Sequence, residues 1–223
     1  MIGIVSDIHG NYPALLAVLD ELGRLDIERV VCLGDVAGYY SQVNECCDLL
    51  KSSNIQMLMG NHDWYLVSGE GCPRSNSANR CLEYQRTVIT DANMEWLSHH
   101  KSEAKFDGVS FVHGGWRDPL DEYMKPSADY FRDISGALFS SGHTHIPILW
   151  EGDGKKYCNP GAVGQPRDGD PRASFAVFHA DCFSIHRVSY DIQRTQEAMR
   201  AAGFSEYFYK NLEAGTRLGG MIG

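Results

Sequence analysis

Apolar and polar positions along the first 63 residues fall into five blocks, in the order strand, helix, strand, helix, strand. Short apolar runs at about 2–7, 29–35 and 55–63 each end in polar residues, as buried strands do at the edge of a sheet. Between them, leucines recur at helical spacing over 11–23, and a second amphipathic helix is predicted over 43–53. This alternation predicts a mostly parallel sheet with helices packed on it.

The first helix carries its own boundary signals. Asn11 is the expected N-cap, because its side chain can accept a hydrogen bond from a free amide of the first turn. Pro13 suits that first turn, where its missing N–H costs nothing. Gly23 is the expected end of the helix.

Antiparallel hairpins dominate the second half of the chain. A buried strand is expected at about 137–141, looser helical segments over 66–103, and two short helices over about 191–215. Hairpin turns are expected at Asp107-Gly108, Asp153-Gly154 and Ala180-Asp181. The pattern therefore predicts two sheets packed face to face with helices outside, in a single α/β domain that spans residues 1–223.

Composition narrows the class of protein. A chain of 223 residues is long enough to bury a core, and its net charge of −9 disfavours a surface for long nucleic acids. The seven cysteines show no C-x-x-C spacing, which favours buried thiols in a reducing compartment. Neither a leader pattern nor a membrane-spanning apolar run is present in the sequence, so we expect a cytoplasmic protein without a membrane partner.

Residues that can bind metals stand at the ends of five predicted strands. In an α/β sheet the carboxyl ends of the strands form the ligand-binding edge. Seven side chains there offer carboxylate, amide or imidazole donors: Asp7, His9, Asp35, Asn61, His113, His143 and His145. Seven donors exceed the needs of one tetrahedral zinc ion but suit two adjacent cations that share a carboxylate.

The segment Gly142-His143-Thr144-His145 raises a more local question. In extended backbone, His143 and His145 would point to the same side of the strand. Two neutral imidazoles in that position can bind one cation or a neighbouring pair of cations.

The ordered motifs D-x-H, G-D, G-N-H-D, V-H-G and G-H-T-H resemble those of the calcineurin-like metallophosphoesterase superfamily, over residues 1 to about 165. The resemblance implies a four-layer α/β/β/α sandwich, with two mixed sheets flanked by helices and a two-metal centre at one edge. It also implies a role for each side chain. Asp7, His9 and His145 would hold the first metal, Asn61, His113 and His143 the second, with Asp35 bridging the metals and His62 as the general acid.

The run after Asp35 separates branches of the superfamily. Phosphoprotein phosphatases carry an acidic residue and an arginine there, whereas this chain has Gly38 and Tyr39. The G-Y version resembles small prokaryotic phosphodiesterases and asymmetrical-type dinucleoside polyphosphate hydrolases.

Three side chains are candidates for substrate contact. Arg167 lies in a Gly/Pro-rich segment over 159–175, which can either face an anion or form a structural turn with the arginine in solvent. Tyr39 and Trp116 could stack on a base or an aryl group, or could pack in the core. Specificity is expected to come from the irregular regions 66–103 and 116–130.

The expected activity is hydrolysis of a small phosphodiester or nucleotide phosphoanhydride by a hydroxide that bridges two metals, with His62 as acid. The expected cofactors are two divalent transition-metal ions, with Mn, Fe, Zn, Co and Ni as candidates. The expected partner is a small phosphorylated substrate, with nucleotides among the candidates. Alternatives are a phosphomonoesterase or phosphoprotein phosphatase of the same superfamily, or a non-catalytic protein-binding scaffold of the same fold.

Overall fold

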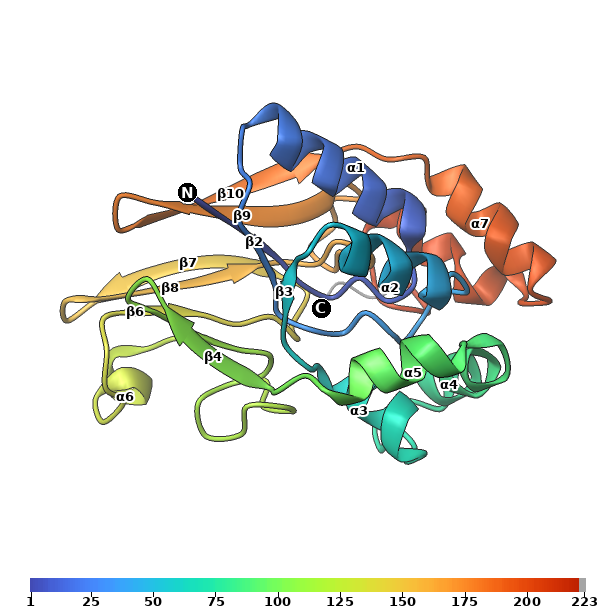
Figure 1. Ribbon diagram of the computed structural model, residues 1–223, viewed down its shortest axis with the longest axis horizontal. Coiled ribbons are helices and arrows are strands. Elements are labelled where there is room, and N and C mark those ends of the chain that lie inside the picture. Colours follow the sequence, from blue (N-terminus) through green and yellow to red (C-terminus); the bar gives the residue numbers. More distant parts are fainter. Residues whose placement is uncertain (221–223) are drawn as a thin grey trace.

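The computed structural model describes residues 1–220 and contains two five-stranded sheets that lie face to face (Figure 1). The last three residues of the predicted domain over 1–223 lie outside the described residues. The strands run in the order β10-β9-β1-β2-β3 in the first sheet and β4-β5-β6-β8-β7 in the second. The overall arrangement is the mixed α/β fold with two mixed sheets that the sequence predicts.

The first sheet combines a parallel core with an antiparallel edge. β1 pairs in parallel with β2, which pairs in parallel with β3, and β9 runs antiparallel to both β1 and β10. Its strands are β1 (Ile2–Val5), β2 (Val30–Cys32), β3 (Gln56–Met57), β9 (Ala173–His179) and β10 (Cys182–Val188). The predicted βαβ alternation accounts for the parallel part.

The second sheet has the same mixed character. β5, β6 and β8 are parallel, and β4 and β7 are antiparallel edge strands. Its strands are β4 (Glu103–Phe106), β5 (Val109–Val112), β6 (Leu138–Ser140), β7 (Pro147–Gly152) and β8 (Lys155–Pro160). The three predicted hairpin turns lie between β4 and β5, β7 and β8, and β9 and β10. Each has two consecutive residues in left-handed or equivalent glycine backbone, as tight hairpins require.

Helices cover the first sheet more thickly than the second (Figure 1). The longer helices are α1 (Tyr12–Arg24), α2 (Val43–Ser52), α3 (Asn61–Ser68), α4 (Asn76–Val88), α5 (Asp91–Ser98) and α7 (Ile192–Ala201). The outer face of the second sheet is covered by the one-turn helix α6 (Ala128–Phe131) and its flanking loops. Among residues 1–220, no helix is both long and apolar enough to cross a bilayer.

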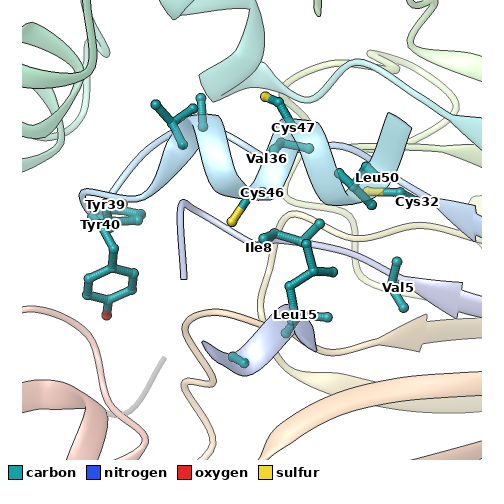
Figure 2. Packing of buried hydrophobic residues seen from close by; sticks show 14 of the residues in the cluster. Val5, Ile8, Leu15, Cys32, Val36, Tyr39, Tyr40, Cys46, Cys47 and Leu50 are labelled. Carbon is teal, nitrogen blue, oxygen red and sulfur yellow. The ribbon is translucent and has the colours of Figure 1, made fainter. Parts of the chain in front are cut away.

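Three apolar clusters hold these layers together. One lies between the sheets and includes Ile4 and Phe111, and a second packs the outer face of the second sheet around Phe139. The largest joins the first sheet to its helices, and in Figure 2 Leu15 on α1 and Cys46 on α2 both point toward Ile8. Six of the seven cysteines are buried and all seven are free, in agreement with the interpretation of the thiols as small apolar residues.

Helix boundaries agree with the sequence at one end of α1 and not at the other. The Asn11 side chain accepts a hydrogen bond from the Ala14 N–H at 3.3 Å, so the predicted N-cap is confirmed. The prediction that Gly23 ends the helix is wrong, because α1 continues to Arg24. An exposed glycine is tolerated inside a helix when packing of the opposite face supplies the stability.

Two other segments differ from their expected form. The polar run after β3 begins α3 directly at Asn61, where a strand end had been expected. At the C-terminus, α7 is followed by two 3₁₀ segments, η1 (Glu206–Phe208) and η2 (Lys210–Ala214), in place of a second α-helix. Both segments are short, and hydrophobic periodicity is weakest over so few residues.

Candidate metal centre

The predicted metal-binding residues follow the strand ends in an uncommon backbone conformation. Five of them lie in the left-handed region, with φ values between 54° and 66°: Asp7, His9, Asp35, His143 and His145. Each such residue costs about 1–2 kcal/mol relative to ordinary backbone. Strain of this kind at adjacent polar residues is characteristic of functional sites.

The backbone at Gly142-His143-Thr144-His145 is not extended. β6 ends at Ser140, and the two histidines have φ values of 66° and 62°. The expectation that they leave a strand in parallel is therefore wrong. The turn sends the two imidazoles into two different groups of side chains.

The first group consists of Asp7, His9 and His145, all buried. His145 Nε2 lies 3.3 Å from Asp7 Oδ1 and 3.0 Å from His9 Nε2. The other ring nitrogens are committed: His9 Nδ1 donates to Ala37 O at 2.7 Å, and His145 Nδ1 donates to Gln165 O at 2.6 Å.

These second contacts fix the tautomers, because a carbonyl oxygen can only accept. Both Nε2 atoms therefore present lone pairs in the neutral rings, and the two lone pairs face each other at 3.0 Å. Two lone pairs this close repel each other, and the repulsion is removed when both nitrogens bind the same cation. The geometry of the first group thus fits a bound metal ion.

The second group consists of Asp35, His113 and His143. His113 Nε2 lies 3.5 Å from Asp35 Oδ1 and 3.1 Å from Asn61 Oδ1. His113 Nδ1 donates to Leu33 O at 2.9 Å, so Nε2 is the ring atom directed toward Asp35 and Asn61. The second group has the same fit to a cation as the first.

Asp35 lies between the two groups. Its Oδ2 is 3.6 Å from His9 Nε2, and its Oδ1 is 3.5 Å from His113 Nε2. Oδ1 also accepts the His62 N–H at 2.8 Å, whereas Oδ2 has no hydrogen-bond partner among residues 1–220. One carboxylate therefore faces both groups, as a bridging ligand must.

Unpartnered polar atoms give a further test of fit. Within the described part of the chain, Asp7 Oδ1, Asp35 Oδ2 and His143 Nε2 are buried and make no hydrogen bond. A buried carboxylate oxygen without a partner is costly, and metal coordination would remove that cost. The donor set of oxygen and imidazole nitrogen suits Mn, Fe, Zn, Co and Ni ions.

The protonation of the site matches this chemistry. Burial lowers the pKa of His9, His143 and His145 well below the ordinary value, so these rings are neutral near pH 7 and available as ligands. Burial also acts on His113, but the charge and hydrogen bond of Asp35 outweigh it and raise its pKa to about 9. A cation at the second group would take the place of that proton.

Two glycines next to the ligands are required because ligand side chains pack directly against their Cα atoms. A Cβ at Gly60 would lie 2.1 Å from Asp35 Oδ1, and a Cβ at Gly38 would lie 2.2 Å from His9 Nδ1. Gly38 occupies the place where phosphoprotein phosphatases carry an acidic side chain. Any side chain at position 38 would displace His9, so only glycine at this position allows the loop to pack against the His9 ring.

His62 lies at the start of α3 and lines the main cavity of the site. Its ring centre is 4.9 Å from that of His9 and 5.1 Å from that of Tyr39. Burial lowers the pKa of His62, with Asp35 acting against that shift, and its Nδ1 has no hydrogen-bond partner among residues 1–220. An anion bound in the cavity would stabilise the imidazolium and raise this pKa.

The structure brings two of the three substrate-contact candidates to the cavity. Tyr39 and Arg167 both line it, and the Arg167 guanidinium lies 5.4 Å from the centre of the Tyr39 ring. Arg167 is only 4% exposed, so the alternative of an arginine in solvent is wrong. Its Nε and Nη2 atoms donate to Gln165 Oε1 at 3.0 and 2.6 Å.

Trp116 is not brought to the cavity. Its ring packs in the cluster outside the second sheet, with its centre 5.0 Å from that of Phe139 and 5.6 Å from that of Phe131. Its Nε1 donates to Ser110 Oγ at 2.9 Å. Of the two interpretations of this residue, the structure supports core packing, because burial of the indole outweighs its closeness to a motif in sequence.

Sequence reasoning missed side chains that support the site. Asp63 accepts the backbone N–H groups of Asp35, Ala37 and Gly60 at 2.7, 2.8 and 3.0 Å, and so holds the turn that carries the bridging carboxylate. The sequence signal that could have indicated this role of Asp63 is its position directly after Asn61 and His62 in the same motif. Arg74 and Arg217, which also line the cavity, carried no sequence signal.

Comparison with known proteins agrees with the geometry. The model of the calcineurin-like phosphoesterase superfamily domain matches residues 1–182. An uncharacterised protein from Methanocaldococcus jannaschii is 34% identical over 240 residues, covering 96% of this chain and 98% of the relative.

Solved structures are similar over nearly the whole chain. A metallophosphoesterase from Sphaerobacter thermophilus is 32% identical with a TM-score of 0.86, covering 96% of this chain and 98% of that one. A hypothetical protein from Pyrococcus horikoshii has a TM-score of 0.85 at 20% identity, covering 97% and 100% of the two chains, and supports the fold alone. With two histidine and carboxylate groups at one edge of the sandwich, the chain belongs to the calcineurin-like phosphoesterase superfamily.

Proposed function

We propose that this phosphoesterase uses two divalent metal ions to hydrolyse a small phosphodiester or a nucleotide phosphoanhydride. The observation that carries the proposal is the pair of buried ligand groups, with Asp35 of the second group also facing His9 of the first at 3.6 Å. Cations bound there would give partners to the buried carboxylate and imidazole atoms that have none among residues 1–220. Asn61, which adjoins the second group, would complete its ligands.

The bound cations and the protein side chains would each have a separate role in the reaction. Bound cations would neutralise the phosphoryl oxygens and make water a better nucleophile near neutral pH. His62 lies at the cavity next to the ligand groups and would donate a proton to the leaving oxygen. Arg167 would hold a phosphoryl oxygen through its guanidinium, and Tyr39 would contact the leaving group beside His62.

The cavity favours a small substrate. Its volume is about 430 Å³, which lies in the range of small-molecule sites. Phosphoprotein phosphatases carry an acidic residue and an arginine where this chain has Gly38 and Tyr39, which disfavours that activity here. A non-catalytic scaffold has no need to bring all seven ligand side chains and His62 together, so the enzyme is favoured.

A panel of substrates and metals tests the proposal. Protein stripped with a chelator would be reloaded in turn with Mn²⁺, Fe²⁺, Zn²⁺, Co²⁺ or Ni²⁺ and assayed with bis-p-nitrophenyl phosphate, p-nitrophenyl phosphate, cyclic nucleotides and dinucleoside polyphosphates. We expect metal-dependent hydrolysis, with diesters or anhydrides preferred over the monoester. Absence of hydrolysis with every metal and substrate would refute the enzyme, and a strong preference for the monoester would refute the proposed substrate class.

A further inference from the structure

The cavity beside His62 is strongly cationic on an acidic protein. Three arginines line it, and they come from separate parts of the chain: Arg74 before α4, Arg167 between β8 and β9, and Arg217 after η2. No aspartate or glutamate lines it within residues 1–220, although the whole chain has a net charge of −9. Positive charge is therefore concentrated where a substrate would lie.

The charges of two of these arginines are not neutralised by the protein. Arg74 is paired with Asp121, and its guanidinium lies 5.2 Å from the centre of the Tyr123 ring. Arg167 is buried and bonded to a neutral amide, and the described residues offer it no carboxylate within 4 Å. Arg217 likewise forms no ion pair with residues 1–220, and its buried Nε has no hydrogen-bond partner among them.

A buried guanidinium without a counter-charge is costly, and a bound anion would remove that cost. The planar guanidinium matches two oxygens of a phosphoryl group at once. The phosphoryl group under attack would be held at the metal ligands, and the arginines line the cavity that continues from Asn61 and His62. A second phosphoryl group is the chemistry that fits there.

We propose that Arg74, Arg167 and Arg217 form a subsite for a second phosphoryl group, so that the preferred substrate is a phosphoanhydride. This inference rests on the proposed function. In the reaction, the oxygen of one water bonds to phosphorus at the metal ligands and the bridging P–O bond breaks. The leaving phosphate keeps the bridging oxygen and takes the proton of His62, and a proton of the water returns to His62 through solvent.

Position in the chain makes Arg217 the most informative of the three. The family model matches residues 1–182, and the segment that carries Arg217 lies beyond the matched residues. Arg74 lies in the irregular region 66–103, and Tyr123 of the cavity lies in the region 116–130. Elements outside the metal-ligand motifs therefore supply the subsite, as expected for determinants of specificity.

The test compares two substrates that differ by one phosphoryl group. These are bis-p-nitrophenyl phosphate and P¹,P²-bis(p-nitrophenyl) diphosphate, assayed with the Mn²⁺-loaded protein. The measured quantity is the ratio of kcat/KM for the diphosphate to kcat/KM for the monophosphate. Arg217→Gln and Arg74→Gln should each lower this ratio by about 10- to 100-fold, the effect of losing a charged hydrogen bond.

Arg24→Gln is the matched control, because that side chain is exposed on α1 and does not line the cavity. It should leave the ratio unchanged. Thermal melts would verify that each variant is folded. An unchanged ratio in both cavity variants would overturn the subsite while leaving the proposed function intact.

If neither substrate is hydrolysed, that result counts against the proposed function and not against the subsite. The subsite is then tested by a binding measurement. Calorimetry of the metal-free protein in EDTA would compare inorganic pyrophosphate with inorganic phosphate. Pyrophosphate should bind more tightly to the wild type, and Arg217→Gln should remove about 10-fold or more of that difference. Equal binding of the two anions to the wild type would refute the subsite.

Discussion

Replacement of Asp35 by asparagine tests the shared-carboxylate arrangement with little change of shape. The Asn side chain keeps an oxygen that can accept the His62 N–H, now made at 2.8 Å to Oδ1. It replaces Oδ2, which faces His9 Nε2 at 3.6 Å, by an NH₂ group without charge or a metal-binding lone pair. The variant therefore removes the carboxylate that faces both groups and little else.

The expected loss can be estimated from what the carboxylate does. Stabilisation of charge by a metal site contributes several kcal/mol, so a loss of about 4 kcal/mol corresponds to about 10³-fold in rate. A metal at 100 times its Kd stabilises the folded protein by about 2.7 kcal/mol. Asp35→Asn should therefore lower kcat/KM for bis-p-nitrophenyl phosphate by about 10³-fold or more. It should also leave fewer metal ions bound than in the wild type and remove most of the metal-dependent rise in Tm.

Activity, metal content by elemental analysis and thermal melts with and without Mn²⁺ would be measured on the same preparations. Asp20→Asn is the control, because Asp20 is an exposed carboxylate on α1 away from the site. Circular dichroism would show that the variant keeps the fold. Wild-type turnover or two tightly bound ions in Asp35→Asn would show that Asp35 does not bridge the metals.

Four further predictions follow from the same geometry. His62→Asn should lower kcat by about 10²-fold or more with metal content unchanged, and loss of metal would make His62 a ligand instead of an acid. Gly60→Ala should reduce metal content and activity, because the new Cβ would lie 2.1 Å from Asp35 Oδ1. Gly23→Ala, where no atom lies within 4 Å of the new Cβ, should stabilise the protein by about 1 kcal/mol. Equal metal binding in both glycine variants would contradict this steric account. Trp116→Ala should lower the free energy of unfolding by about 3 kcal/mol while kcat/KM of the folded protein is unchanged, and a selective rise in KM would return the indole to the substrate site. Finally, burial lowers the pKa values of four histidines in the site, His9, His62, His143 and His145, whereas it raises that of Asp63 to about 7. Because four lowered groups outnumber one raised group, the unfolded chain binds more protons than the folded one below about pH 6.5. The Tm of the metal-free protein should therefore fall as pH is lowered from 7 to 5, and a Tm that rises over this range would refute that ionisation pattern.

Local patterns in the sequence predicted most of the elements. The alternation of apolar runs and helical periodicity located the strands and longer helices, and Asn11 was correctly expected to cap α1. Short elements were less predictable, because a two-residue strand such as β3 or a 3₁₀ turn such as η2 leaves almost no periodicity. The start of α3 at Asn61 was not predicted for the same reason, since its only local signal is three polar residues, Asn61 to Asp63, after a strand.

The sequence by itself determined the donor atoms of the site and their order along the chain. Strand ends can be recognised locally, and the carboxyl ends of parallel strands meet at one edge whatever the details of packing. For that reason the strand ends alone indicate the seven candidate ligands, and the motif resemblance adds His62. The presence of glycine at 38 and 60 was also visible, but the contacts that demand it were not.

The motif resemblance had divided the ligands between two groups, but only the tertiary structure decided the backbone geometry and the side chains that surround them. His143 and His145 face different groups because a left-handed turn, held by contacts from distant segments, replaces the expected extended backbone. Trp116 packs outside the second sheet, while Arg74 and Arg217, almost 150 residues apart in sequence, line one cavity with Arg167. Such juxtapositions depend on how two sheets and their connecting loops pack, and hydrophobic periodicity carries information about neighbours only within one element.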